Sequence, residues 1–235
     1  MAILVVDCCI RKEKSATRKL LESYLAARFG ADYAVEMPED GVLLHGKDCA
    51  VRAECAAAGT AGVGELSGAE SRNDGKPAIE RVYLTEEKLL PLTADDVERR
   101  QSLLDAGKTD DPMFRFAKQF SAADEILIAA PYWDWSFPSL LKVYMEHVSV
   151  SGITFVYRGP SPTGLCKAKR IRYFSTCGGF TEGPHEGVAY IRRIGKAFGI
   201  NEVLEYTIEG LDIEPDKRNK VLATGIEKLS SVWNN

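Results

Sequence analysis

The stretch ADEILIAAPYWDWSFPSLLKVYMEHV, residues 123–148, contains the unit from which the fold is predicted. Residues 126–130 are a short, continuous apolar run, which is typical of a strand buried on both faces of a parallel sheet. Pro138 suits the first turn of a helix, and the residues after it place an apolar stripe on one helix face: Leu141, Tyr144, Met145 and Val148. The stretch therefore predicts a buried strand, an aromatic loop and an amphipathic helix, in that order.

The same alternation of strand and helix extends over the rest of the chain. The apolar patterns predict further strands at 2–6, 82–84, 170–175 and 203–208, and helices at 15–29, at 188–198 and after Pro215. Strands that alternate with helices form a parallel sheet that is covered by helices on both faces. We therefore expect an α/β fold with a doubly wound, five-stranded parallel sheet in three α/β/α layers.

Composition restricts the classes of function. With 235 residues, 45% of them hydrophobic, the chain can bury about 70% of its unfolded surface, so residues 1–235 are expected to form a single domain. The net charge of -4 gives no sustained positive surface for nucleic acid. The apolar runs are far shorter than the ~20 residues that cross a bilayer, and residues 1–9 contain no basic leader, so a cytoplasmic protein without membrane contact is expected. The six cysteines have no paired CxxC spacing, so we expect reduced thiols and no metal site.

Residues 30–78 do not fit the alternation and are too long for an ordinary connection. They include the Ala- and Gly-rich sequence AECAAAGTAGVGELSGAE, whose small side chains bury too little apolar surface to offset the entropy of ordering. One expectation is a mobile insertion of uncertain structure. The alternative is a lid or a dimer contact.

The loop DCCIRKEKSAT, residues 7–17, joins the first predicted strand to the first helix. The free backbone N–H groups and the positive dipole end of a helix N-terminus suit a phosphate, and Ser15 and Thr17 could add hydroxyl donors. Ser15 could equally be a simple helix cap. The sequence contains neither GxGxxG nor GxxxxGK[ST], so no dinucleotide fingerprint or P-loop is present.

The loop PYWDWSFP, residues 131–138, places four aromatic residues within six positions directly after a buried strand. Such a cluster is costly to leave in water unless a planar group covers it. Backbone amides in this loop could reach the edge of a flavin, and Asp134 could accept a hydrogen bond from a ring N–H. Packing at the sheet end or at a subunit interface is the alternative.

The loop TCGG, residues 176–179, follows the strand at 170–175. Paired glycines allow a close approach of the backbone, so N–H groups could meet a ring oxygen that gains negative charge on reduction. A plain tight turn is the alternative. All three loops are predicted at the carboxyl edge of one parallel sheet, where such sheets bind their ligands.

Residues 123–165, which continue as SVSGITFVYRGPSPTGL, resemble FMN-dependent NADH-azoreductases and NAD(P)H:quinone oxidoreductases, a family with a flavodoxin-like fold. The strand, the Pro-aromatic loop, the pair Leu141 and Lys142 and the GITF turn occur in the family's order. TCGGF at 176–180 and the pair Gly199 and Ile200 continue the match. The resemblance covers residues 1–29 and about 79 to the end, and excludes the insertion.

The resemblance implies an FMN site. Around the phosphate it would place Cys9, Ser15, Ala16 and Thr17; along the isoalloxazine Pro131, Tyr132, Trp133, Asp134 and Trp135; and at the pyrimidine side Thr176, Cys177, Gly178 and Gly179. The substrate pocket would include Tyr132, Trp135, Phe180 and His185. Cys8 with Cys9, Trp133 with Asp134, and Cys177 depart from the residues usual in the family.

The implied activity is the NAD(P)H-dependent reduction of quinones, azo compounds or similar small acceptors. Hydride would pass to N5 of FMN in a ping-pong cycle, so no catalytic side chain is required. NADH or NADPH would be the donor, and the resemblance also implies a homodimer. The alternatives are a flavodoxin-type electron carrier, an NAD(P)H:FMN reductase without a dedicated organic acceptor, a thiol enzyme that uses Cys9 or Cys177, and a flavin-free interaction module.

Overall fold

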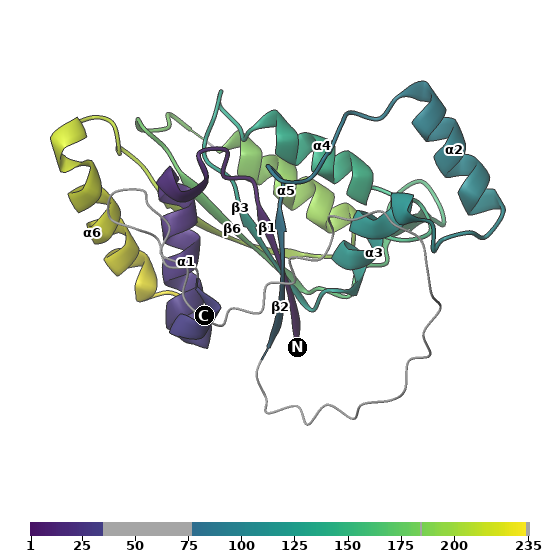
Figure 1. Cartoon of the computed structure of the whole chain (residues 1–235), viewed down its shortest axis with the longest axis horizontal. Helices are drawn as coiled ribbons and strands as arrows, with labels where there is room; N and C mark the ends of the chain where they lie inside the picture. The colour runs from purple at the N-terminus through teal and green to yellow at the C-terminus, as the bar shows by residue number, and fades with distance from the viewer. Residues whose placement is uncertain (35–76, 184, 234–235) are drawn as a thin grey trace, which may run out of the picture.

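The computed structural model describes residues 1–34, 77–183 and 185–233 (Figure 1). Its main sheet has five parallel strands in the order β2-β1-β3-β6-β7. Their bounds are β1 Ala2–Asp7, β2 Ala78–Tyr83, β3 Glu125–Ala129, β6 Arg170–Thr176 and β7 Glu202–Ile208. Counted among these five strands alone, the order is 2-1-3-4-5, which is the flavodoxin-like order.

Alternating side chains of the sheet create two cores. Ile3 and Val5 of β1 pack with α1 (Ala16–Phe29) and α6 (Arg218–Ser230). Leu4 and Val6 point to the opposite face, where they pack in one cluster with α3 (Arg115–Ala122), α4 (Ser139–Val148) and α5 (Glu186–Ala197). Figure 1 shows the two helical layers on opposite sides of the sheet. The predicted doubly wound, three-layer α/β/α fold is therefore confirmed.

Two helices and a small hairpin were not predicted from the apolar patterns. Helix α2 (Ala94–Asp105) has no buried residue, so it lacks the apolar stripe by which a helix is recognised. Its start is fixed instead by a capping box between Thr93 and Asp96. Helix α3 is only eight residues long, and strands β4 (Phe155–Tyr157) and β5 (Pro162–Gly164) form a separate antiparallel pair.

The second strand begins earlier than the predicted range of 82–84. It spans Ala78–Tyr83 at the edge of the sheet, and of its residues only Val82 is buried. The charged residues Glu80 and Arg81 interrupt the apolar pattern, so the first half of β2 was not predicted. The predicted insertion at about 30–78 lies mostly outside the described residues. Within the described ranges, no helix is both long and apolar enough to cross a membrane.

Candidate functional site

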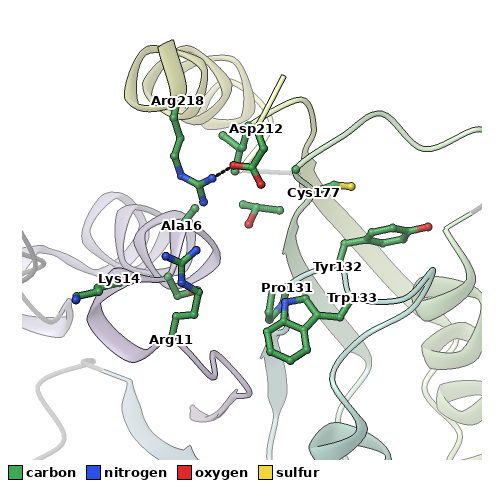
Figure 2. A pocket seen from close by; sticks show the side chains of 13 residues that line it. Arg11, Lys14, Ala16, Pro131, Tyr132, Trp133, Cys177, Asp212 and Arg218 are labelled. Atoms are coloured by element: carbon green, nitrogen blue, oxygen red, sulfur yellow. Dashed lines mark hydrogen bonds and ion pairs between the residues drawn. The ribbon is translucent and has the colours of Figure 1, made fainter. Parts of the chain in front are cut away.

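Four loops meet at the carboxyl edge of the sheet and enclose a pocket (Figure 2). The pocket holds about 490 Å³ of empty space, part of which is open to solvent. The loops after β1, β3 and β6, which were predicted to converge, all contribute to its walls. The loop after β7 and the start of α6 complete it, and the full lining is Arg11, Lys14, Ser15, Ala16, Pro131, Tyr132, Trp133, Thr176, Cys177, Gly178, Leu211, Asp212 and Arg218.

The N-terminus of α1 forms one wall of the pocket. Ser15 is the N-cap, and its hydroxyl accepts a hydrogen bond from the Arg18 N–H at 3.4 Å. Among the described residues, no protein acceptor is found for the N–H groups of Ala16 and Thr17. Of these two residues only Ala16 lines the pocket, so its N–H and the positive end of the helix dipole lie at this wall, an arrangement that binds anions.

A buried ion pair holds the loop before this helix in place. The Asp7 carboxylate, at the end of β1, accepts from Arg18 Nε at 2.6 Å and from the Cys9 N–H at 2.8 Å. The Thr17 hydroxyl lies 2.7 Å from that of Thr176 and links α1 to the end of β6. The anion-binding wall is thus fixed to two strands before any ligand arrives.

The aromatic loop contains a tight turn in an uncommon conformation. Trp133 and Ser136 exchange two backbone hydrogen bonds, of 3.2 and 2.7 Å. The two central residues, Asp134 and Trp135, have φ of 47° and 61°. A tryptophan in the left-handed region is rare, and such strain concentrates at binding sites. The turn leaves Tyr132 and Trp133 on the pocket wall, and the Tyr132 N–H donates to the Thr176 carbonyl at 3.0 Å.

The loops after β6 and β7 are joined by their backbones. The N–H of Leu211 donates to the Cys177 carbonyl at 3.1 Å, and the N–H of Asp212 donates to the Gly178 carbonyl at 2.8 Å. A Cβ at Gly178 would lie 2.4 Å from Asp212 Oδ2, so the Asp212 carboxylate would have to move. The glycine therefore lets the acidic loop approach the pocket.

Several of the predicted site residues do not line the pocket. Cys9 is fully buried in the core beside α1, and its thiol points to the Ala129 carbonyl at 3.8 Å. Thr17 is also fully buried, so it does not reach the pocket. The remaining ones lie at the tip of the aromatic turn or just beyond the glycine loop: Asp134, Trp135, Gly179 and Phe180. Of these, Trp135 and Phe180 are 78% and 70% exposed.

His185 lies beneath the pocket and not on its wall. It is the N-cap of α5, where its Nδ1 accepts from the Val188 N–H at 3.4 Å. The Tyr132 ring contacts it edge to face, with the ring centroids 4.7 Å apart. Burial lowers the pKa of His185 below its ordinary value, which keeps the ring neutral and Nδ1 free to accept. Its position makes it a support for Tyr132.

Five pocket residues were missed by the sequence analysis: Arg11, Lys14, Leu211, Asp212 and Arg218. Arg11 and Lys14 lie within the quoted loop of residues 7–17, so their presence at an expected anion site was a readable signal. The other three follow β7, the last strand. The general rule that ligands bind at the carboxyl edge of such sheets would have indicated that loop as well.

The chemistry of a thiol enzyme is not supported by the environment of the cysteines. Burial raises the pKa of Cys9 well above that of a free thiol, and the neighbouring Asp7 charge raises it further. Burial also raises the pKa of Cys177, although the Gly179 N–H partly opposes this. Both thiols are therefore held protonated at neutral pH. In the described part of the chain, no cluster of three or more His, Cys, Asp or Glu side chains could bind a metal.

Comparison with known proteins defines the class to which this fold and pocket belong. A family model described as a flavodoxin-like fold, Flavodoxin_2, matches residues 65–232, which is more than two thirds of the chain. The chain belongs to this family of flavodoxin-like proteins. It is 36% identical over 163 residues to an FMN-dependent NADH:quinone oxidoreductase of Clostridium perfringens, and the match covers 68% of this chain and 82% of the relative. It is 38% identical over 124 residues to an FMN-dependent NADH:quinone oxidoreductase of Clostridium acetobutylicum, covering 51% of this chain and 62% of that protein.

Solved structures share the fold. An azoreductase from Bacillus anthracis strain Sterne superposes with a TM-score of 0.71 and 21% identity, covering 100% of this chain and 99% of that one. An FMN-dependent NADH-azoreductase from Bacillus anthracis strain Ames Ancestor, solved in complex with FMN, gives a TM-score of 0.67 and 16% identity, with 100% and 98% covered. At these identities the structures establish the fold alone.

Proposed function

We propose that this protein is an FMN-dependent oxidoreductase that takes electrons from NADH or NADPH and reduces quinones, azo compounds or similar small acceptors. The observation that carries the proposal is the convergence of the loops after β1, β3 and β6 on one pocket. The relatives named FMN-dependent NADH:quinone oxidoreductases support the same cofactor and activity.

The residues of the pocket fit FMN. The N–H of Ala16, at the N-terminus of α1, would hold the phosphate, since helix N-termini bind such groups without a charged side chain. Pro131, Tyr132 and Trp133 would flank the ring, and the Gly178 backbone would lie at its polar edge. When bound, FMN supplies the capacity to accept hydride and pass electrons on.

This chain supplies orientation and a shielded pocket. The strained turn holds Trp133 half exposed at the rim, where it would exclude water from one side of a planar ligand. The Tyr132 backbone N–H donates to the Thr176 carbonyl, and the Tyr132 ring makes an edge-to-face contact with the His185 ring. The two aromatic residues therefore form a preorganised wall.

The test is a visible spectrum of the purified protein with and without added FMN, followed by NADH and then a small quinone under anaerobic conditions. We expect a bound yellow chromophore that NADH bleaches and the quinone restores. A colourless protein that does not bind added FMN would overturn the proposal. A flavin that is reduced by NADH but not reoxidised by any quinone or azo compound would leave the electron-carrier alternative.

The thiol alternative has a separate test. Cys177→Ser preserves the size of the side chain at the pocket wall and removes the nucleophile. We expect the variant to retain NADH-dependent quinone reduction within a few-fold of the parent, because both candidate thiols are protonated. Complete loss of activity with flavin still bound would favour thiol chemistry.

A homodimer and a cytoplasmic location are part of the proposal. The dimer is supported by the exposed aromatic side chains of Trp135 and Phe180, in the loops after β3 and β6, which a second copy could cover. The location is supported by the free thiols Cys8, Cys9, Cys166 and Cys177, since disulfides are rare in the cytosol. Sedimentation at micromolar concentration would test the dimer, with Trp135→Glu expected to shift it towards monomer.

A further inference from the structure

The pocket wall carries more positive charge than backbone recognition of a phosphate requires. Arg11, Lys14 and Arg218 are cationic, and the single anionic residue of the lining is Asp212. Arg11 belongs to the loop after β1, whereas Arg218 begins α6 on the far side of the pocket. Figure 2 shows both guanidinium groups extending towards the region of Ala16, while Lys14 points away. The two arginines thus flank the wall that holds the free N–H groups.

The two like charges interact across the gap. Desolvation lowers the pKa of Arg218, and the Arg11 charge lowers it further. Both side chains nevertheless remain charged at neutral pH, because arginine does not lose its proton in this range. The two guanidinium groups repel one another, and an anion bound between them would relieve this repulsion.

Arg218 has a partner that it can give up at low cost. Its Nη1 forms an ion pair with Oδ1 of Asp212, and the two side chains are 33% and 62% exposed. Pairs this exposed contribute little, because water solvates both ions when they separate. A phosphate dianion offers the planar guanidinium two charge-assisted bonds, which are stronger than an exposed carboxylate contact.

We propose that Arg218 exchanges its partner Asp212 for the terminal phosphate of the flavin, with Arg11 on the other side, and that this exchange selects FMN over uncharged riboflavin. The inference rests on the proposed function. In this proposal the α1 backbone binds the phosphate, and Arg218 and Asp212 have a separate role, which is to select the cofactor. Asp212, which is mostly exposed, keeps the cation neutralised until a phosphate competes for it.

The experiment is a titration of flavin-free protein with FMN and with riboflavin, followed by flavin fluorescence. In the parent we expect FMN to bind much more tightly than riboflavin. Arg218→Met should weaken FMN about 10- to 100-fold, the effect of losing hydrogen bonds to a charged group, and change riboflavin by less than about 2-fold. Asp212→Asn should tighten FMN by a few-fold, because the competing carboxylate is gone.

A matched control is Arg99→Met. Arg99 forms an exposed ion pair with Asp111, and neither residue lines the pocket. The variant should alter neither affinity. Circular dichroism of each variant checks that it is folded, and Arg218→Lys should recover part of the FMN affinity.

Failure of the inference and failure of the proposed function give different results. If the parent binds no flavin, the proposed function falls, and the inference with it. If the parent binds FMN but Arg218→Met binds it equally well, the inference alone is overturned. The same conclusion follows if Arg218→Met raises only the KM for NADPH, or if Asp212→Asn weakens FMN.

Discussion

Two arginine–carboxylate pairs in this molecule have the same chemistry and opposite surroundings. Arg172 of β6 pairs with Glu125 of β3 at 2.7 Å, with side-chain exposures of only 1% and 9%. Arg218 pairs with Asp212 at the pocket, where both side chains reach water. A buried charge cannot lose its partner without a large desolvation cost, whereas an exposed one can exchange it. Burial therefore makes the first pair a structural element and leaves the second available to a ligand.

The largest effect should come from the buried pair. Arg172→Met leaves Glu125 without its partner in the core and also removes the hydrogen bond from Arg172 to the Tyr206 hydroxyl. We expect a loss of about 3–5 kcal/mol in the free energy of unfolding, measured by urea denaturation. The double variant Arg172→Met with Glu125→Leu should recover much of it. A loss below about 1 kcal/mol in the single variant would mean that water already reaches the pair.

The next effect separates helix capping from ligand binding at the pocket. Ser15→Ala removes the cap of α1 and should cost about 1 kcal/mol of unfolding free energy. It should also weaken FMN, because the free N–H groups of the first turn become less ordered. Thr93→Ala removes the corresponding cap of α2, which is not part of the pocket, and should leave FMN affinity unchanged. Equal loss of FMN affinity in both variants would rule out a specific role for the α1 terminus.

A smaller effect should appear as a pH dependence. Because burial lowers the pKa of His185, the unfolded chain takes up a proton near pH 6.5 before the folded protein does. Stability is therefore full above about pH 7 and falls as the pH drops through 6.5 towards the lower folded pKa. His185→Asn keeps a capping acceptor but cannot titrate. Urea denaturation between pH 7.5 and 5.5 should show a smaller fall in this variant, and an identical fall would exclude His185 as the source.

The smallest effect on stability should come from the exposed pair. Arg218→Met is expected to change the free energy of unfolding by less than about 0.5 kcal/mol, since both partners remain solvated when separated. This contrasts with its large expected effect on FMN affinity. A stability loss as large as that of Arg172→Met would show that the exposed pair is also structural.

The sequence predicted the parallel sheet because its central strands are buried on both faces. Residues 126–130 are a continuous apolar run, and β3 spans Glu125–Ala129. The range 170–175 was also predicted as a strand, although it includes Arg170 and Arg172, and β6 spans Arg170–Thr176. Helix α2 escaped prediction for the opposite reason, since it packs too little apolar surface to show a stripe. Its capping box at Thr93 and Asp96 was the available local signal.

The candidate site was likewise predictable from the sequence only in part. The loops that follow the predicted strands could be located from the sequence, and Ser15, Trp133 and Gly178 of these loops line the pocket. Which of their neighbours face inward could not be read, because the turn at Asp134 and Trp135 adopts a conformation that the sequence does not signal. Sequence patterns also give no sign of the pairing between the β6 and β7 loops that brings Asp212 to Gly178.

By itself, the sequence determined the alternation of strands and helices, and hence the edge of the sheet at which the predicted loops meet, because a strand buried on both faces, such as that at 126–130, requires an apolar run. Only the tertiary structure decided which charges reach the pocket. Arg11 and Arg218 are far apart in the chain, and their meeting depends on how α1 and α6 pack on one face of the sheet. That packing is a long-range property, which no local pattern of residues encodes.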